Sequence, residues 1–143
     1  MNAACELCTQ DGGLVVHRDD FLRVVLVEDA DYPGFCRVIW TAHVREMTDL
    51  PVAQRGRLMA AVWAVEAALR EVMQPHKINL ACLGNMTPHL HWHVIPRFAD
   101  DRHFPAPVWA PVQRDAMPAS LAQRTAQLPA LQQAIRRQLT PVM

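Results

Sequence analysis

The sequence is short of glycine and has no surplus of either charge. Only five of its 143 residues are glycine, and the chain contains neither a G-x-x-x-x-G-K-[ST] loop nor a G-x-G-x-x-G stretch. The 14 acidic residues balance the 14 basic ones, so no long-range field attracts a nucleic-acid polymer or an anionic membrane. Any phosphate therefore has to be bound locally, by side chains.

Long apolar runs are also missing. No segment is apolar enough to span a bilayer, and residues 1–5 lack the basic and apolar regions of a signal peptide. Of the four cysteines, Cys5 and Cys8 form a C-x-x-C pair, while Cys36 and Cys82 stand alone in apolar runs. This pattern suits a reducing compartment, and we expect a cytoplasmic protein without a membrane partner.

The chain is long enough, and hydrophobic enough at 51%, to form one compact domain without disulfides. Apolar and β-branched stretches predict strands at residues 14–16, 21–27, 36–40, 78–83 and 89–95. Apolar residues recur at helical spacing between Leu58 and Val72, which predicts an amphipathic helix that Pro75 ends.

The carboxy-terminal third reads differently. Four prolines between residues 104 and 118 exclude a helix or a central strand there, so this segment should run extended over the surface. Residues 119–139 look helical again, with a break or kink at Pro129. We therefore predict a domain over residues 1–118 and a helical extension, 119–143, packed on the same domain.

Three histidines alternate in His89-Leu90-His91-Trp92-His93. Because side chains alternate along a strand, the three imidazoles should share one face, while Leu90 and Trp92 pack on a core. A neutral imidazole is a nucleophile at neutral pH once a hydrogen bond to one ring nitrogen fixes the lone pair on the other. Histidines at this spacing are also typical of catalytic zinc. From spacing alone, a nucleophile and a metal site are equally supported.

The run from His89 to Ile95, followed by Pro96-Arg97, resembles the motif of the histidine triad (HIT) family of nucleotide hydrolases and transferases. The resemblance covers roughly residues 5–109. It implies an α+β fold with a five-stranded antiparallel sheet packed against one main helix, with the carboxy-terminal helical segment outside it. It also implies a homodimer.

The resemblance also implies roles for individual residues. The middle histidine, His91, would attack the α-phosphorus of a nucleotide, and His93 would contact the phosphate. Asn79 matches an asparagine that positions substrate. Gly84 and Asn85 match the start of a Gly-Gln-Ser or Gly-Gln-Thr stretch whose polar side chains face the phosphate.

The sequence departs from the family pattern at two places. Met86 replaces the hydroxyl residue of that stretch, so that Thr87 would have to substitute from the next position. The family also has an acidic residue for the ribose hydroxyls near the end of the strand that begins here at Phe21. This sequence has Val27 at that position, with Glu28 and Asp29 beside it. Trp109 resembles a downstream tryptophan that can lie near the active site, and it is equally well explained as a packing residue.

Many bacterial members of the family carry a C-x-x-C near the start that binds structural zinc with two histidines. The matching residues are Cys5, Cys8, His43 and the first triad histidine, His89. Two thiolates and two imidazoles make a closed tetrahedral site without an open position for catalysis. His89 would then brace the strand that carries His91 instead of acting on substrate.

The leading hypothesis is an enzyme that cleaves a dinucleoside polyphosphate, such as diadenosine tetraphosphate, or a nucleoside phosphoramidate through a nucleotidyl-His91 intermediate. Two alternatives stay open. One is a nucleotide-binding regulatory dimer with little turnover, and the other is a catalytic metal site held by the triad.

Overall fold

The computed structural model describes residues 2–143; Met1, the first residue of the predicted domain, lies outside them. Its centre is one antiparallel sheet of five strands in the order β1-β2-β3-β5-β4. The strands are β1 (Leu14–Arg18), β2 (Leu22–Leu26), β3 (Cys36–Trp40), β4 (Lys77–Ala81) and β5 (His91–Arg97). The predicted α+β class with a five-stranded antiparallel sheet is confirmed.

Strand β5 differs from its prediction at both ends. It begins at His91, so His89 lies before the strand, and it continues through Pro96 to Arg97. Pro96 is tolerated because the ladder between β3 and β5 ends at Val94, which leaves β4 as the only neighbour of β5 at that point. The histidine run is therefore divided between a connecting segment and a strand.

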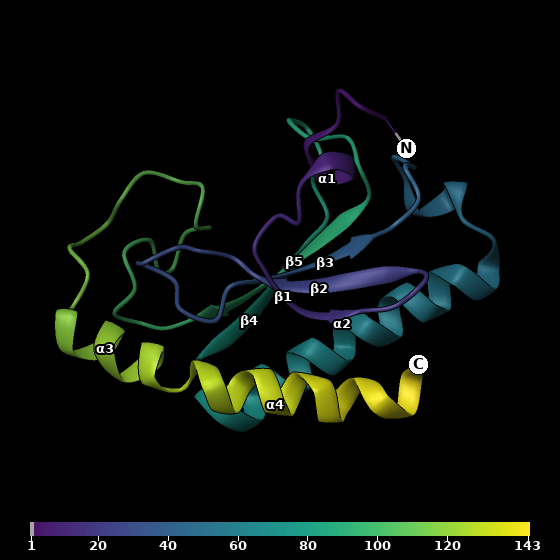
Figure 1. Ribbon diagram of the computed structural model, residues 1–143. Helices are drawn as coiled ribbons and strands as arrows, with labels where there is room; N and C mark the ends of the chain where they lie inside the picture. The colour runs from purple at the N-terminus through teal and green to yellow at the C-terminus, as the bar shows by residue number, and fades with distance from the viewer. Residues whose placement is uncertain (1) are drawn as a thin grey trace.

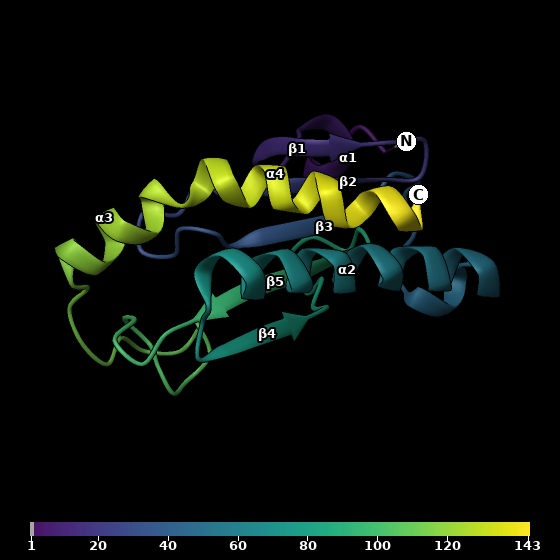
Figure 2. The same cartoon turned by 90° about the horizontal axis from the view of Figure 1, so that it is seen from below.

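The two longest helices lie on one face of the sheet. The elements are α1 (Glu6–Thr9), η1 (Met47–Asp49), α2 (Val52–Met73), α3 (Pro118–Ala126), α4 (Leu128–Leu139) and η2 (Thr140–Val142). Figure 2 shows α2 and α4 side by side across the sheet. The predicted break near Pro129 occurs at Gln127, because proline fits the first turn of a new helix.

The main core lies between these two helices and the sheet. Leu58, Val62, Val65 and Leu69 of α2 are fully buried, as their helical spacing predicts. From α4, the side chains of Leu131, Ala134, Ile135 and Leu139 complete the same cluster. The carboxy-terminal helix is therefore part of the core, while the exact boundary at residue 118 stays a prediction.

The opposite face of the sheet is covered by short segments. Helix α1 lies over it near the start of β5, and the loops after β2 and β5 lie over its other end (Figure 1). Because successive residues of β5 point to opposite faces, Trp92 and Val94 pack toward the helices. His91 and His93 consequently lie on the face that α1 and the loops border.

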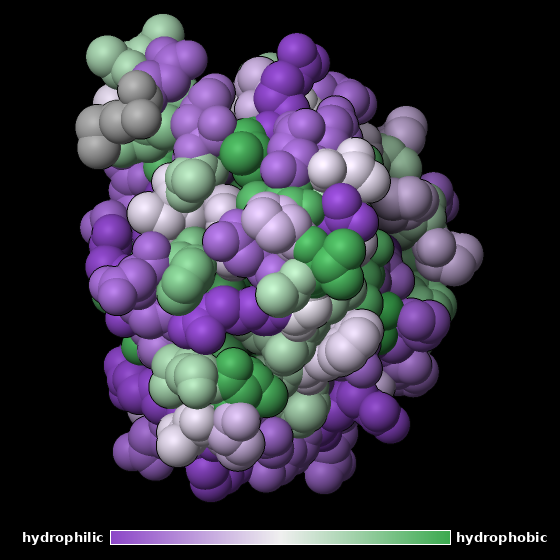
Figure 3. Space-filling view, turned by 90° about the vertical axis from the view of Figure 1, so that its right-hand side faces the viewer, coloured by the Kyte–Doolittle hydropathy of each residue, from purple (hydrophilic) through white to green (hydrophobic). Residues whose placement is uncertain are grey.

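No helix of residues 2–143 is long and apolar enough to cross a membrane. On the face in Figure 3, hydrophobic residues form small groups separated by hydrophilic ones.

Removing a buried side chain of α4 should destabilise the whole domain, because α4 fills the core against α2. We expect Leu131→Ala to lower the free energy of unfolding by about 2–5 kcal/mol in urea denaturation followed by circular dichroism. Gln133→Ala, at an exposed position of the same helix, should leave it nearly unchanged. Equal small losses in both variants would contradict a core role for α4.

Candidate functional site

His91 has a ring orientation fixed by the backbone just before it. Its Nδ1 donates a hydrogen bond of 2.5 Å to the carbonyl oxygen of His89. The proton therefore sits on Nδ1, and Nε2 carries the lone pair. Nε2 makes no hydrogen bond to any residue from 2 to 143, so the lone pair is free. This is the arrangement that a nucleophilic imidazole needs.

His93 lies beside His91 on the same face of β5. The two ring centroids are 4.9 Å apart, and the rings meet edge to face. Nδ1 of His93 is buried and has no hydrogen-bond partner within the described chain. Since a buried N–H without an acceptor is rare, the bare nitrogen is best explained as a lone pair, with the proton on Nε2. In that tautomer His93 can donate to a phosphate oxygen.

Both histidines are kept neutral. Burial lowers the pKa of His93 to about 4, with further contributions from His91 and from the positive charge of Arg37. The pKa of His91 is also lowered, mainly by burial and partly by Arg37, although its bond to the His89 carbonyl acts in the opposite direction. Arg37 is the cross-strand partner of His93 in the ladder between β3 and β5. The environment thus favours the nucleophilic form of His91 at neutral pH.

The expectation that three imidazoles share one wall is wrong for His89. This residue precedes the strand, and its Nε2 donates a 2.6 Å hydrogen bond to the carbonyl oxygen of Trp40. That bond fixes the lone pair on Nδ1, which lies 3.5 Å from the sulfurs of both Cys5 and Cys8. The first triad histidine is directed at the cysteines.

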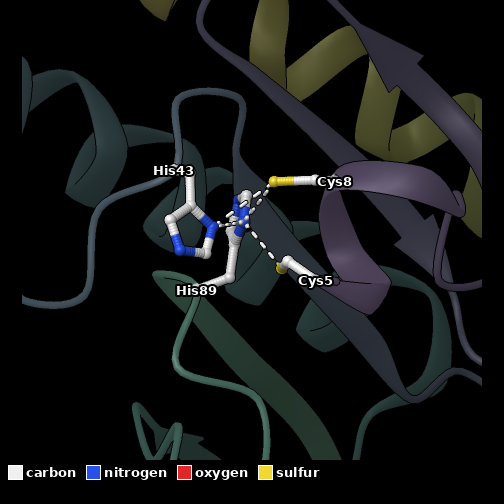
Figure 4. A group of neighbouring side chains, drawn as sticks. All are labelled: Cys5, Cys8, His43 and His89. Atoms are coloured by element: carbon white, nitrogen blue, oxygen red, sulfur yellow. Dashed lines mark hydrogen bonds between the residues drawn. The ribbon is translucent and has the colours of Figure 1, made fainter. Parts of the chain in front are cut away.

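His43 completes this group. Its Nδ1 lies 3.3 Å from the sulfur of Cys8 and 3.2 Å from Nδ1 of His89. Figure 4 shows the four side chains converging from three segments: α1, the turn after β3 and the segment before β5. One donor atom from each residue lies within 4.8 Å of all the others. The sequence-predicted metal ligands are therefore brought together.

The spacing of these atoms fits a tetrahedral zinc ion. With Zn–S near 2.3 Å and Zn–N near 2.0–2.1 Å, a tetrahedron puts two nitrogens about 3.3 Å apart and a sulfur and a nitrogen about 3.5 Å apart. The observed distances are 3.2 Å between the two nitrogens and 3.3–3.5 Å between sulfur and nitrogen. Four of the six donor pairs therefore have the spacing of a tetrahedral site, and all six lie within 4.8 Å.

Arg23 holds the cysteine segment against the sheet. This buried residue of β2 donates to the carbonyl oxygens of Leu7 at 2.8 Å, Gln10 at 2.9 Å and Asp11 at 2.9 Å. Because these carbonyls belong to α1 and the residues after it, the guanidinium fixes the position of Cys8. Nothing in the local sequence pattern pointed to this arginine.

Asn79 and Trp109 line one cavity of about 710 Å³ along strand β4. Asn79 faces Ile95 in the register of β4 and β5, and Ile95 points to the same face as His93. Trp109 comes from the loop after β5, where its ring centroid is 5.0 Å from that of His93, although 53% of the residue stays exposed. Trp109 thus contacts the triad, and Asn79 lies on the same face of the sheet, where its role toward substrate stays a prediction.

The loop between β4 and β5 carries the residues that the resemblance assigns to the phosphate. Gly84 has a φ of +80°, which suits the predicted turn. Met86 is 97% exposed, and Thr87 lines a cavity with Cys5 and His43 instead of one with His93. Asn85 and Thr87 make no side-chain hydrogen bond within residues 2–143. Contact of Asn85 and Thr87 with a phosphate stays a prediction.

The ribose-binding residue is not apparent from this arrangement either. Val27 packs with Tyr32, Phe35 and Ile95 on the triad face of the sheet. Glu28 and Asp29 line a separate cavity of about 550 Å³, whose far side is formed by Thr125, Leu128 and Gln132.

The comparisons with known proteins agree with this geometry. Residues 9–100 match the HIT domain family, which covers more than half of the chain. The chain belongs to the histidine triad (HIT) family.

Among curated proteins, an AP-4-A phosphorylase from Mycobacterium tuberculosis is 30% identical over 102 residues. The match covers 67% of this chain and 52% of that protein. The chain thus spans about half the length of the curated relatives it matches.

Solved structures of the family share the whole fold. A histidine triad protein from Bradyrhizobium japonicum is 30% identical, with a TM-score of 0.70 over 90% of this chain and 91% of its own. One from Marinobacter aquaeolei is 27% identical, with a TM-score of 0.71 over 94% and 98%. A Zn-bound histidine triad family protein from Mycobacterium smegmatis is 19% identical over 94% of both chains, with a TM-score of 0.64, which supports the fold alone.

The depressed pKa of His93 predicts that the protein loses stability in acid. Between about pH 6.5 and pH 4 the unfolded chain binds a proton at this residue that the folded chain does not, so the free energy of unfolding falls as the pH falls. The slope from this one group is at most about 1.4 kcal/mol per pH unit. Urea denaturation at pH 7, 6 and 5 measures it.

The same series with His93→Phe isolates this effect. Protonation of the cysteine and histidine cluster affects both proteins equally, so it cancels in the difference. The variant should show the shallower pH dependence. Identical slopes would mean that His93 titrates alike in the folded and unfolded chains.

Proposed function

We propose that this protein is a nucleotide hydrolase or nucleotidyl transferase that cleaves at the α-phosphorus through a covalent nucleotidyl-His91 intermediate. The observation that carries the proposal is the neutral imidazole of His91, whose lone pair is fixed on Nε2 by the bond to the His89 carbonyl. Membership of the histidine triad family and the AP-4-A phosphorylase relative support a nucleotide as substrate.

The reaction has two steps. In the first, Nε2 of His91 attacks the α-phosphorus, a phosphorus–nitrogen bond forms, and the bond to the leaving oxygen or nitrogen breaks. In the second, water attacks the same phosphorus, which releases the nucleoside monophosphate and returns the electron pair to Nε2. With diadenosine tetraphosphate the products are ATP and AMP. If inorganic phosphate replaces water, the second product is ADP.

Neighbouring side chains are suited to the charge on the phosphate. His93 would donate from Nε2 to a non-bridging oxygen, and its position 4.9 Å from His91 allows both rings to reach one phosphoryl group. Asn79 offers an amide at the adjacent cavity. Gly84, Asn85 and Thr87 stay proposed contacts by resemblance, with weaker support from their positions in the loop.

A catalytic metal held by the three triad histidines is the less favoured alternative. Nδ1 of His89 is directed at Cys5 and Cys8, while Nδ1 of His91 is bonded to a carbonyl oxygen. The three rings therefore do not offer lone pairs to a common point. A metal bound by the two cysteines, His43 and His89 would instead be structural zinc, which supplies rigidity and leaves no coordination position for substrate.

Three further proposals accompany this function. The partner is a small nucleotide and not a nucleic-acid polymer, because acidic and basic residues balance. The protein is expected to act as a homodimer, which the free outer edge of β4 supports, since an unpaired edge readily adds another strand. It is also expected to be cytoplasmic.

Trapping of the intermediate tests the nucleophile. Diadenosine tetraphosphate labelled at the α-phosphorus is mixed with the protein and quenched in alkali, in which a phosphoramidate bond survives. We expect label on the wild-type chain and none on His91→Ala, whose turnover should fall roughly 10³-fold or more. His76→Ala, at an exposed histidine, is the matched control and should keep both.

The outcomes separate the alternatives. Retention of wild-type turnover by His91→Ala would disprove the mechanism. Tight nucleotide binding without turnover, across polyphosphates and phosphoramidates, would favour a regulatory role. Product analysis with and without inorganic phosphate tells hydrolysis from phosphorolysis.

Removal of the cysteine ligands tests the metal. The Cys5→Ser, Cys8→Ser double variant should lose about one equivalent of zinc by elemental analysis and melt at lower temperature, because two of the four ligands are gone. At temperatures at which the double variant is still folded, it should keep turnover. Cys82→Ser, a cysteine outside the cluster, should keep the metal. A folded double variant without any activity would favour a catalytic metal.

A further inference from the structure

We propose that Arg97 is a positioning residue that orients the amide of Asn79, so that its two N–H donors face the substrate phosphate beside His93. This inference deepens the proposed function and rests on it. Arg97 is the last residue of the stretch that resembles the family motif, and that resemblance implies no role for it. Its contacts now connect the loop after β5 with the edge of the nucleotide site.

Arg97 is held almost rigidly. Its Nε donates to Oδ2 of Asp101 at 2.8 Å and its Nη2 to Oδ1 at 3.1 Å, which is a bidentate pair. Nη2 also donates to the carbonyl oxygen of Ala106 at 2.7 Å. Arg97 and Asp101 are only 2% and 3% exposed. The remaining nitrogen, Nη1, therefore has little freedom of position.

The carboxylate of Asp101 is ionised under all ordinary conditions. Burial alone would raise its pKa, but the hydrogen bonds from Arg97 and from backbone amides outweigh burial and lower the pKa to about 2. Backbone N–H groups of Phe98, His103 and Phe104 donate to it at 2.7–3.1 Å. Asp101 thus anchors the guanidinium permanently.

Nη1 of Arg97 donates to Oδ1 of Asn79 at 2.8 Å. A guanidinium has only donors, so its partner on the amide has to be the carbonyl oxygen and not the NH2 group. A flipped amide would set N–H groups against N–H groups. The carbonyl of Asn79 is consequently occupied, and Nδ2 is left with two N–H groups for another acceptor.

The position of Asn79 makes a phosphate oxygen the natural acceptor. Asn79 and Arg97 lie on the same face of the sheet as His93, because Asn79 pairs with Ile95, and His93, Ile95 and Arg97 alternate along β5. Asn79 lines the cavity that also contains Trp109, whose ring contacts His93. Without Arg97 the amide could turn its carbonyl oxygen toward the phosphate and repel it.

A double-mutant cycle tests this role. Asn79→Ala, Arg97→Lys and the double variant are compared with wild type by the affinity for AMP and by KM and kcat for diadenosine tetraphosphate. Lysine keeps the charge opposite Asp101 but not the fork that reaches acceptors on three residues. Each single variant should weaken AMP binding and raise KM roughly 3- to 10-fold, with a smaller effect on kcat.

The decisive comparison is between the effect of Arg97→Lys in the wild-type protein and its effect in the Asn79→Ala variant. If Arg97 acts through Asn79, Arg97→Lys adds no further loss to Asn79→Ala. Arg102→Lys is the matched control, because Arg102 belongs to the same loop and pairs with Asp31 at the surface at 3.1 Å. It should change none of these values.

A second readout does not depend on turnover or on the folding of any variant. In the 15N spectrum of the wild-type protein, the side-chain amide signals of Asn79 should shift on titration with AMP. Unshifted Asn79 signals at saturating AMP would overturn the positioning role. So would a double variant whose loss of AMP affinity is the product of the losses in Asn79→Ala and Arg97→Lys. Either result would leave the proposed function intact. A wild-type protein that neither binds AMP nor cleaves the substrate would overturn the proposed function and this inference together.

Discussion

The backbone at His89 is the point on which the rest of the site depends. Its carbonyl oxygen accepts a hydrogen bond from Nδ1 of His91. This bond leaves the free lone pair of that ring on Nε2. The side chain of the same residue is fixed by the carbonyl of Trp40 and directed at Cys5 and Cys8. A displacement of this one residue would therefore disturb both the ligand cluster and the nucleophile. The cluster and the nucleophile are thus coupled through His89, whose side chain belongs to the cluster and whose carbonyl oxygen orients His91.

The fold could be predicted from the sequence where periodicity was strong. The helical spacing of Leu58, Val62 and Val65 identified α2 and its buried face, and the β-branched stretches identified all five strands. The limits of β5 could not be predicted, because Pro96 marks the end of a strand only when both neighbours pair with it. The packing of α4 in the core depends on contacts with α2, which no local pattern encodes.

The site shows the same division. The grouping of Cys5, Cys8, His43 and His89 was predictable from the family resemblance, and the alternation in the triad placed His91 and His93 together. The position of His89 before the strand, and not on it, could not be predicted, because no local pattern marks the start of β5 at His91. Arg23, Arg37 and Arg97 could not be found in advance, because each acts on segments that are distant from it in the sequence. The roles of Asn85 and Thr87 in the loop rest on the family resemblance and stay predictions.

The cluster near α1 also has a consequence for the topology of the chain. Cys5 and His89 are 84 residues apart and Cys8 and His43 are 35 residues apart, yet their donor atoms are neighbours. An ion bound to all four residues would close the loop between Cys5 and His89 and the loop between Cys8 and His43. The entropic cost of closing a loop grows only slowly with its length, so these long loops would cost little more than short ones. The amino-terminal segment, with one short helix of four residues, would then exchange its amide hydrogens at a rate governed by opening of the sheet.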